Sequence, residues 1–350
     1  MPGEWEPHVR THMCWPCRRE LWGTGLAAAK AAYAEVARAI ARHEPVLMAA
    51  NPADAAEAAN ILCPPLSANA GKPAGGHLPP PAALPRGGRE PGHAIDIWKT
   101  KLDDSWARDI GPTFVKDGEA THAIAWRFNA WGGKYDGFAD DARFAARLGE
   151  KLAVPVHPAS IICEGGAIHS DGAGTILTTE QCLLNPNHNP GLTRAVAEEI
   201  LKYALGARRV VWLGDGFSDH ETDGHVDNIA CFTPGGAVLV GVPDSRAHPD
   251  HAPVMEAIRR LKAAGLEAIE LAQPRTPRHD GQGRLLPASY INFYLCNGGL
   301  IMPSFDDRND EAARATLAAA FPGRAISVVP ALAIVQGGGG IHCITQQQPA

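Results

Sequence analysis

A unit of four elements recurs along this chain and limits what it can fold into. Two short strand-like runs are followed by a helix with apolar residues at helical spacing, and then by one more strand-like run. From the second unit onward the pattern returns after roughly fifty to sixty residues, a period typical of propellers and other repeat architectures. We therefore expect one α/β domain over residues 1–350, built of pseudo-symmetric strand-strand-helix-strand units.

The elements of these units can be placed from residue pattern alone. Helices are expected at 26–42, 140–152, 193–205, 253–264 and 310–321. Strand pairs are expected at 113–115 with 120–127, 167–169 with 175–178, 229–233 with 237–242, and 290–296 with 300–302. Single strands after the helices are expected at 210–213, 267–271 and 326–329.

The two ends of the chain complete this arrangement. Only one strand-like run, residues 11–15, precedes the first helix, and the C-terminal run 341–346 has no helix after it. Ile341, Ile344 and Thr345 are β-branched and suit a strand. Pairing the last strand with the first unit would close a ring, which removes exposed sheet edges.

Residues 63–93 do not fit the repeat. They are rich in proline, glycine and alanine, as expected for a long irregular surface loop. We assign this insert no function.

The net charge of −6 makes nucleic acid an improbable partner and a small cation a more natural one. The sequence has no apolar run of membrane-spanning length and no basic, then apolar, leader. These features favour a cytoplasmic protein with no membrane association.

Eight cysteines spread over such a chain are expected to be free thiols. The close pair Cys14 and Cys17 is compatible with a thiol oxidoreductase or with half of a zinc site. No second ligand pair at zinc-finger spacing is evident in the sequence. Two incidental thiols are therefore the favoured interpretation, with the oxidoreductase as an alternative.

Four polar clusters lie near the start of the first strand of a unit, or at the closing strand. They contain Asp109, Glu164, His225 with Asp227, and Cys343. Taken singly they are unspecific, since His-x-Asp alone occurs three times in the chain. In a pseudo-symmetric ring, however, equivalent positions converge on the axis, so these residues are expected to face one central pocket.

The motifs around these residues resemble those of the agmatine deiminases, within the guanidine-modifying superfamily that includes arginine and peptidylarginine deiminases. In chain order they read MPGEWEPH, DDSWARDIGPTFV, EGGAIHSDGAGTILTTEQCLLNPNHNP, ETDGHVDNIACF, ASYINFYLCNGG and GGGGIHCITQQQP. The resemblance implies a five-bladed α/β propeller closed by the C-terminal strand, and a homodimer or larger homo-oligomer. It also implies that Asp109, Glu164, His225, Asp227 and Cys343 are the catalytic residues.

Two positions depart from the family pattern. Gly340 stands where the family usually has asparagine, and Cys17-Arg18-Arg19-Glu20 replaces a usual Glu-Arg-x-Asp. Gly340 is expected to loosen the backbone beside Cys343. The second change is expected to affect N-terminal contacts at the pocket rim or between subunits.

The implied reaction converts agmatine and water to N-carbamoylputrescine and ammonia, as in putrescine biosynthesis. Asp109 and Asp227 would clamp the guanidinium, and Cys343 would attack its carbon to form a covalent amidino-cysteine intermediate. His225 would act as acid and then as base, oriented by Glu164. No metal or organic cofactor is required; a zinc site of His225, Asp227 and Cys343 suits these residues less well than a cation pocket.

The other end of agmatine carries an ammonium, which favours an acidic pocket mouth. Glu221 and Asp223 are candidates for it, and Trp106 is a further candidate for contact with the substrate. An arginine or peptidylarginine deiminase is the nearest alternative, because free arginine would need a cation for its carboxylate. A catalytically inactive scaffold is a third possibility, against which the complete catalytic set argues.

Overall fold

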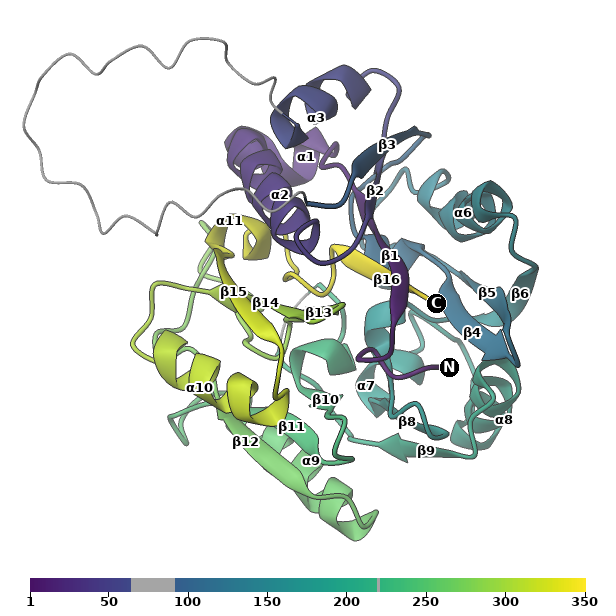
Figure 1. Ribbon diagram of the computed structural model, residues 1–350. Helices are drawn as coiled ribbons and strands as arrows, with labels where there is room; N and C mark the ends of the chain where they lie inside the picture. Colours follow the sequence, from purple (N-terminus) through teal and green to yellow (C-terminus); the bar gives the residue numbers. More distant parts are fainter. Residues whose placement is uncertain (64–91, 219–220) are drawn as a thin grey trace, which may run out of the picture.

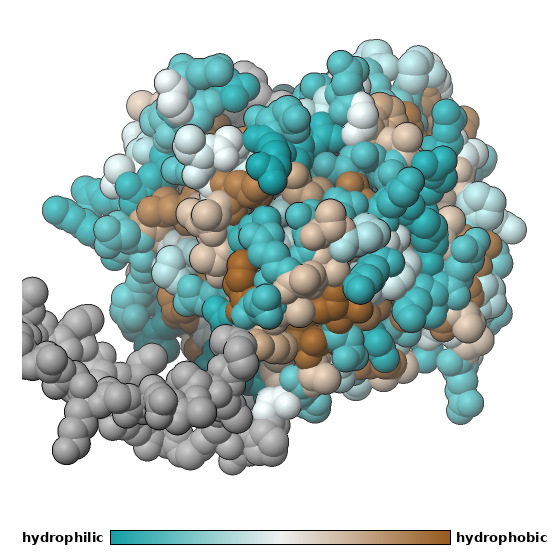
Figure 2. All heavy atoms as spheres, turned by 90° about the horizontal axis from the view of Figure 1, so that it is seen from above, coloured by the Kyte–Doolittle hydropathy of each residue, from teal (hydrophilic) through white to brown (hydrophobic). Residues whose placement is uncertain are grey.

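The computed structural model describes residues 1–63, 92–218 and 221–350, and these form five small sheets with helices packed around them (Figure 1). The insert expected at 63–93 lies almost wholly outside the described residues. No helix in the described ranges is both long and apolar enough to span a bilayer. Hydrophilic side chains cover most of the face seen in Figure 2, with hydrophobic ones in small areas between them.

Four of the sheets share one topology. In each, the first two strands are antiparallel and the third is parallel to the second. The strands are β4 (Thr113–Asp117), β5 (Ala120–Arg127), β6 (Val156–Ile162); β7 (Ile168–Ser170), β8 (Thr175–Thr178), β9 (Arg209–Trp212); β10 (Ala230–Phe232), β11 (Val238–Val242), β12 (Ala268–Ala272); and β13 (Tyr294–Cys296), β14 (Gly299–Ser304), β15 (Ala325–Pro330). The repeat expected from the sequence is thereby confirmed at the level of its strands.

A helix joins the second strand of each of these sheets to the third. These helices are α6 (Phe144–Leu152), α8 (Arg194–Leu205), α9 (His251–Ala263) and α10 (Asp310–Ala320). In α8, the Thr193 side chain accepts a hydrogen bond from the Val196 amide, and Gly206 ends the helix at φ 66°. All four helices were expected, with ends that differ by a few residues at most.

The remaining sheet contains both ends of the chain. Its order is β16 (Thr345–Pro349), β1 (His8–Cys14), β2 (Val46–Ala50) and β3 (Ile95–Lys99), with β16 antiparallel to β1. Helix α2 (Leu26–Ile40), also expected, joins β1 to the parallel β2. The C-terminal strand therefore supplies the strand that the first unit lacked, as expected (Figure 1).

The sequence analysis missed β3 and helix α3 (Ala55–Leu62), and it gave no ranges for β2 and β6, which follow their helices as the repeat predicts. The shorter helical elements are α1 (Arg19–Trp22), η1 (Gly23–Gly25), α4 (Ala107–Ile110), α5 (Ala130–Gly133), η2 (Asp141–Arg143), η3 (Gly165–Ala167), α7 (Glu180–Leu183), η4 (Val226–Asn228) and α11 (Leu332–Val335). Several of these short turns carry the polar clusters described below.

The last strand begins at Thr345, so the expected strand at 341–346 is wrong for its first four residues. Thr345 Oγ1 donates to the carbonyls of Ile341 and His342 at 3.0 Å, which folds this segment into a turn. Ile341 and Ile344 are fully buried in the largest core cluster, and burying each contributes about 1.5–3 kcal/mol. Their hydrophobic side chains thus anchor a turn that carries Cys343.

Candidate active site

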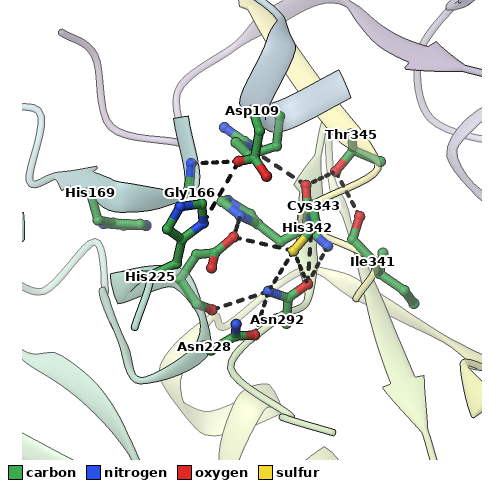
Figure 3. Close-up of polar contacts among 12 residues, drawn as sticks. Asp109, Gly166, His169, His225, Asn228, Asn292, Ile341, His342, Cys343 and Thr345 are labelled. Carbon is green, nitrogen blue, oxygen red and sulfur yellow. Dashed lines mark hydrogen bonds and ion pairs between the residues drawn. The ribbon is translucent and has the colours of Figure 1, made fainter. Parts of the chain in front are cut away.

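Each of the five sheets contributes one polar residue from just before the first strand of its unit. Asp109 precedes β4, Glu164 precedes β7, Asp227 precedes β10, Asn292 precedes β13 and Cys343 precedes β16. All five are buried, and Figure 3 shows Asp109, Asn292 and Cys343 close together around His225. The expected convergence of the four clusters is observed, and Asn292 is a fifth member that the sequence analysis missed.

His225 and Asp227 link the members of this group. His225 Nδ1 is 3.8 Å from Asp109 Oδ1, and His225 Nε2 is 3.6 Å from Glu164 Oε2. Cys343 Sγ lies 3.6 Å from Asp227 Oδ2. The five residues expected to be catalytic therefore surround one small volume.

The thiol of Cys343 is protonated when this volume holds no cation. Burial raises its pKa well above the usual range, and Asp227 and Asp109 raise it further. Asn292 opposes them, since its Nδ2 donates to Cys343 Sγ at 3.3 Å. The sequence argument that nearby carboxylates disfavour a thiolate in the empty site agrees with this environment.

Gly340 makes room for Asn292 beside the thiol. A Cβ atom added at Gly340 would lie 2.3 Å from Asn292 Oδ1, far inside contact distance. Asn292 Oδ1 in turn accepts a hydrogen bond from the His342 amide at 2.9 Å. The side chain of Asn292 thus occupies the space that a larger residue at 340 would need.

Asp109 is held by uncharged donors. Its carboxylate accepts hydrogen bonds from Gly166 N at 3.1 Å and from Trp131 Nε1 at 3.0 Å. Burial raises the pKa of Asp109 to about 6, with His225 opposing and Asp227 adding to the rise. Asp109 is therefore close to its protonation midpoint in weakly acidic solution.

Asp227 is held by a cationic network that the sequence analysis did not find. Its Oδ2 lies 2.9 Å from His342 Nδ1, and His342 Nε2 lies 2.9 Å from Glu4 Oε1. Arg108 pairs with the same Glu4 at 3.1 Å. Burial would raise the pKa of Asp227, but His342 outweighs it and lowers the pKa below its ordinary value. Asp227 is consequently ionised at neutral pH.

Glu164 lies between two imidazoles. His188 Nε2 is 3.3 Å from Glu164 Oε1, on the opposite oxygen from His225. Burial opposes ionisation, yet the two histidines lower the pKa of Glu164 far below its ordinary value. Burial would also lower the pKa of both histidines, but Cys182 and Glu164 raise that of His188 to about 10, and Asp109 and Cys182 raise that of His225. Both imidazoles are therefore cationic at neutral pH.

Cys343 and Asp109 line a small inner cavity of about 20 Å³. Trp106, Trp131, Tyr135, Glu221, Thr222 and Gly337 to Gly339 complete its wall. An outer cavity of about 540 Å³ shares Tyr135, Glu221, Gly337 and Gly338 with it. Glu221 thus lies where the two cavities meet, and Tyr135 donates a hydrogen bond of 2.5 Å to its carboxylate.

Other residues singled out from the sequence have different surroundings. Asp223 is paired with Lys134 at 2.9 Å and accepts a hydrogen bond from Asn187, and it lines neither cavity. Arg18 and Glu20, within the departure from the family pattern, line the outer cavity. Burial raises the pKa of the Cys14 and Cys17 thiols, the opposite of what a reactive pair requires.

The described residues contain one group whose side chains could hold a metal ion. The possible ligand atoms of Glu164, Cys182 and His225 all lie within 4.8 Å of one another. The set considered from the sequence, with Asp227 and Cys343, does not form such a group within these ranges.

The chain is similar to known proteins over nearly its whole length. The family model of the Porphyromonas-type peptidyl-arginine deiminases matches residues 1–349. An agmatine deiminase of Pseudomonas aeruginosa is 37% identical over 100% of this chain and 95% of its own. An Enterococcus faecalis agmatine deiminase structure superposes with a TM-score of 0.87 and 31% identity, over 100% of this chain and 95% of that one.

A second solved structure was determined with a ligand. It is a Cys-to-Ser variant of the C. jejuni agmatine deiminase with substrate bound, which superposes with a TM-score of 0.85 and 25% identity over 100% of this chain and 96% of that one.

Proposed function

The chain belongs to the agmatine deiminases of the Porphyromonas-type peptidyl-arginine deiminase family, and we propose that it hydrolyses agmatine at Cys343 to N-carbamoylputrescine and ammonia. The observation that carries this proposal is the position of a buried thiol between two buried carboxyl groups at the inner end of a cavity. Such a site suits a planar cation with several N–H groups.

The two carboxylates provide the binding energy at the reacting end. Asp109 and Asp227 each accept N–H bonds from the guanidinium, and charge-assisted bonds of this kind contribute about 1.5–3 kcal/mol each. The bound cation also stabilises the thiolate of Cys343, since it offsets the two negative charges that oppose ionisation. Substrate binding and activation of the nucleophile are thereby coupled.

The chemical steps then use one acid–base residue. The Cys343 thiol releases its proton to solvent as the guanidinium binds, because the resting His225 is already protonated. The thiolate adds to the guanidinium carbon, and His225 gives its proton to the departing nitrogen, which leaves as ammonia. Neutral His225 next takes one proton from water as its oxygen attacks the amidino-thioester. Collapse of this adduct gives the urea product and expels the sulfur, which takes up the second proton of the water and returns to the thiol. Glu164 orients His225, and the raised pKa of His225 supports its starting role as acid.

We assign the tail of the substrate to Glu221 and Trp106. Both line the inner cavity, and Glu221 also faces the outer one, where the agmatine ammonium would lie. Among the described residues, the outer cavity is lined by three cations, Arg18, Lys134 and Arg284. Each is already paired, with Asp104, Asp223 and Asp280 respectively. This pairing favours an ammonium tail over the carboxylate of free arginine.

Glu221→Gln tests this assignment. Loss of the carboxylate should lower kcat/KM for agmatine roughly ten- to a hundredfold, mostly through KM, because the ammonium keeps its charge during the reaction. An analogue with a methyl group in place of the amine should be affected far less. Asp136→Asn is the matched control, since Asp136 follows Tyr135, lines neither cavity and is not the ion-pair partner of Arg18, Lys134 or Arg284. An unchanged preference between the two substrates would exclude Glu221 from tail recognition.

One assay tests the function itself: ammonia release from agmatine, free arginine and a blocked peptidyl arginine, measured side by side. Agmatine should be turned over fastest. Cys343→Ser should abolish turnover and still bind agmatine, because the carboxylates are intact. A covalent adduct trapped on another cysteine, located by mass spectrometry, would overturn the assignment.

Further proposals concern the fold, the domain organisation, the oligomeric state and cofactors. We infer that the five sheets are the blades of a propeller that β16 closes, and that residues 1–350 form one catalytic domain with an insert at about 63–93. A homodimer in the cytoplasm, without metal or organic cofactor, is our working model. Sedimentation and metal analysis of the purified protein test it.

A further inference from the structure

A buried thiol that the deiminase reaction does not use lies beside the acid–base pair. Cys182 is fully buried in α7, and its amide donates to Thr179 Oγ1, the N-cap of that helix, at 3.3 Å. Its sulfur lies within 4.8 Å of the nearest oxygen of Glu164 and nitrogen of His225. Three different metal-ligating groups therefore meet at one buried point.

The possible ligand atoms at this point lack regular hydrogen bonds. Both ring nitrogens of His225 and both oxygens of Glu164 are buried, and within the described part of the chain their contacts are the looser ion pairs of 3.3–3.8 Å given above. His225 Nε2 and Glu164 Oε2 are 3.6 Å apart. Tetrahedral zinc, with bonds of about 2.0–2.1 Å to nitrogen and oxygen, would separate such atoms by about 3.4 Å. The two donors need only a small shift to share a cation.

We propose that Glu164, Cys182 and His225 bind a zinc-class divalent cation, and that binding of this cation and deimination of agmatine exclude each other. A thiolate, an imidazole and a carboxylate together favour Zn²⁺ over Mg²⁺ or Ca²⁺, which prefer oxygen ligands. The exclusion rests on the role of His225 proposed above, whereas the metal site does not.

The charges of the ligands match the charge of the cation. A carboxylate, a thiolate and a neutral imidazole together carry two negative charges when they bind a metal, which equals the charge of one Zn²⁺. The filled site therefore buries no net charge and avoids the large desolvation cost that a buried unpaired charge would carry.

Neighbouring groups orient the ligands. Asp109 Oδ1 lies 3.8 Å from His225 Nδ1, the nitrogen that would not touch the metal. His188 Nε2 lies 3.3 Å from Glu164 Oε1, which leaves Oε2 toward His225. A histidine ligand backed by a carboxylate is a common arrangement in metal sites. The metal would hold the nitrogen of His225 that faces Glu164 and would remove the proton that the leaving group needs.

The first test measures metal directly and does not depend on activity. Co²⁺ added to the full-length protein should give a near-ultraviolet sulfur-to-cobalt absorption band in wild type, in Cys343→Ser and in the control Cys231→Ala, another buried thiol. The band should be lost in Cys182→Ala and in the size-matched Cys182→Ser, with folding checked by circular dichroism. A band that persists in both Cys182 variants but disappears in Cys343→Ser would place the cation on the nucleophile and overturn the proposal.

The second test uses turnover. Zn²⁺ should inhibit agmatine hydrolysis reversibly, and EDTA should restore activity. Mg²⁺ and Ca²⁺ should not inhibit. The zinc concentration for half inhibition should rise at least tenfold in Cys182→Ser and remain unchanged in Cys231→Ala. Equal inhibition of all these variants would overturn the exclusion, whereas a protein without agmatine turnover that still binds Co²⁺ through Cys182 would contradict only the proposed function.

Discussion

Asp109 and Asp227 reach the same pocket from different sheets, and the protein surrounds them differently. Asp109 accepts hydrogen bonds from an indole and a backbone amide, and its pKa is raised to about 6. Asp227 lies 2.9 Å from the His342 imidazole, and its pKa is lowered. Burial is similar for the two, so the difference comes from the charge of their partners.

This difference separates a carboxylate whose charge is fixed by the fold from one whose charge depends on pH. Asp227 is ionised at neutral pH because a cation within the protein compensates it. Asp109, with a pKa of about 6, is mostly ionised at neutral pH and becomes protonated in weakly acidic solution. The Cys343 thiol ionises only when the guanidinium arrives.

Replacing each carboxylate in turn should have the largest effect. Asp227→Asn and Asp109→Asn should each lose about 3–6 kcal/mol of transition-state stabilisation at pH 8, or roughly two to four orders of magnitude in kcat/KM, since two charge-assisted bonds are weakened. At pH 5.5 the loss for Asp109→Asn relative to wild type should shrink, because wild-type Asp109 is then largely protonated. The loss for Asp227→Asn should not shrink. If kcat/KM of the two variants depended on pH in the same way, the proposed difference in ionisation between Asp109 and Asp227 would be wrong.

The cationic partner of Asp227 should have the next largest effect. His342→Gln removes the charge that lowers the pKa of Asp227, so this pKa should rise and the acid limb of kcat/KM should move to higher pH. The loss at neutral pH should be roughly ten- to a hundredfold. The control is His169→Gln: burial lowers the pKa of His169 to about 4, so this residue carries no charge at neutral pH. A shift of similar size in the control would show that His342 acts through packing alone.

The indole that serves Asp109 should have a smaller effect. Trp131→Phe removes the hydrogen bond that favours ionised Asp109, so the pKa of Asp109 should rise above 6 and its acid limb should move upward. We expect roughly a tenfold loss in kcat/KM at pH 7 and less at pH 9. Trp126→Phe is the control, since Trp126 donates to Thr113 instead. A loss that is constant with pH would contradict the role of Trp131 in the ionisation of Asp109.

Deleting residues 67–89, which lie outside the described residues, should have the smallest effect. Turnover of agmatine should stay within a few fold, and the contrast between Asp109→Asn and Asp227→Asn should persist in the shortened protein. A large loss in a shortened chain that still folds would show that the insert contributes to the site.

The sequence predicted the site residues that stand at equivalent positions in the repeated units. It did not predict the contacts between residues far apart in the sequence. Asp109, Glu164 and Asp227 stand just before an expected first strand and Cys343 lies within the expected closing strand, and the family resemblance singled these residues out as catalytic. Asn292 occupies the same position in its unit, but a strand was expected over 290–296, whereas β13 begins at Tyr294. With a strand expected to begin only at Tyr294, Asn292 would have stood just before it and would have been recognised as a fifth site residue.

Contacts between residues far apart in the sequence could not be predicted from the residues around them. Glu4 and His342 are 338 residues apart, and both stand in recognised motifs without any hint that they touch. His188 likewise lies in a quoted motif, yet its contact with Glu164 depends on how two sheets are placed. The β-branched residues near Cys343 misled in another way, because Ile341 and Ile344 are buried by a turn instead of a strand.

The protonated resting state of Cys343 has a consequence for the durability of the enzyme. Peroxide oxidises thiolates to sulfenic acid and reacts slowly with thiols. Because burial, together with Asp227 and Asp109, keeps the sulfur protonated until a guanidinium enters, the idle enzyme should resist peroxide. When the substrate does make the sulfur reactive, it also fills the pocket through which an oxidant would have to pass.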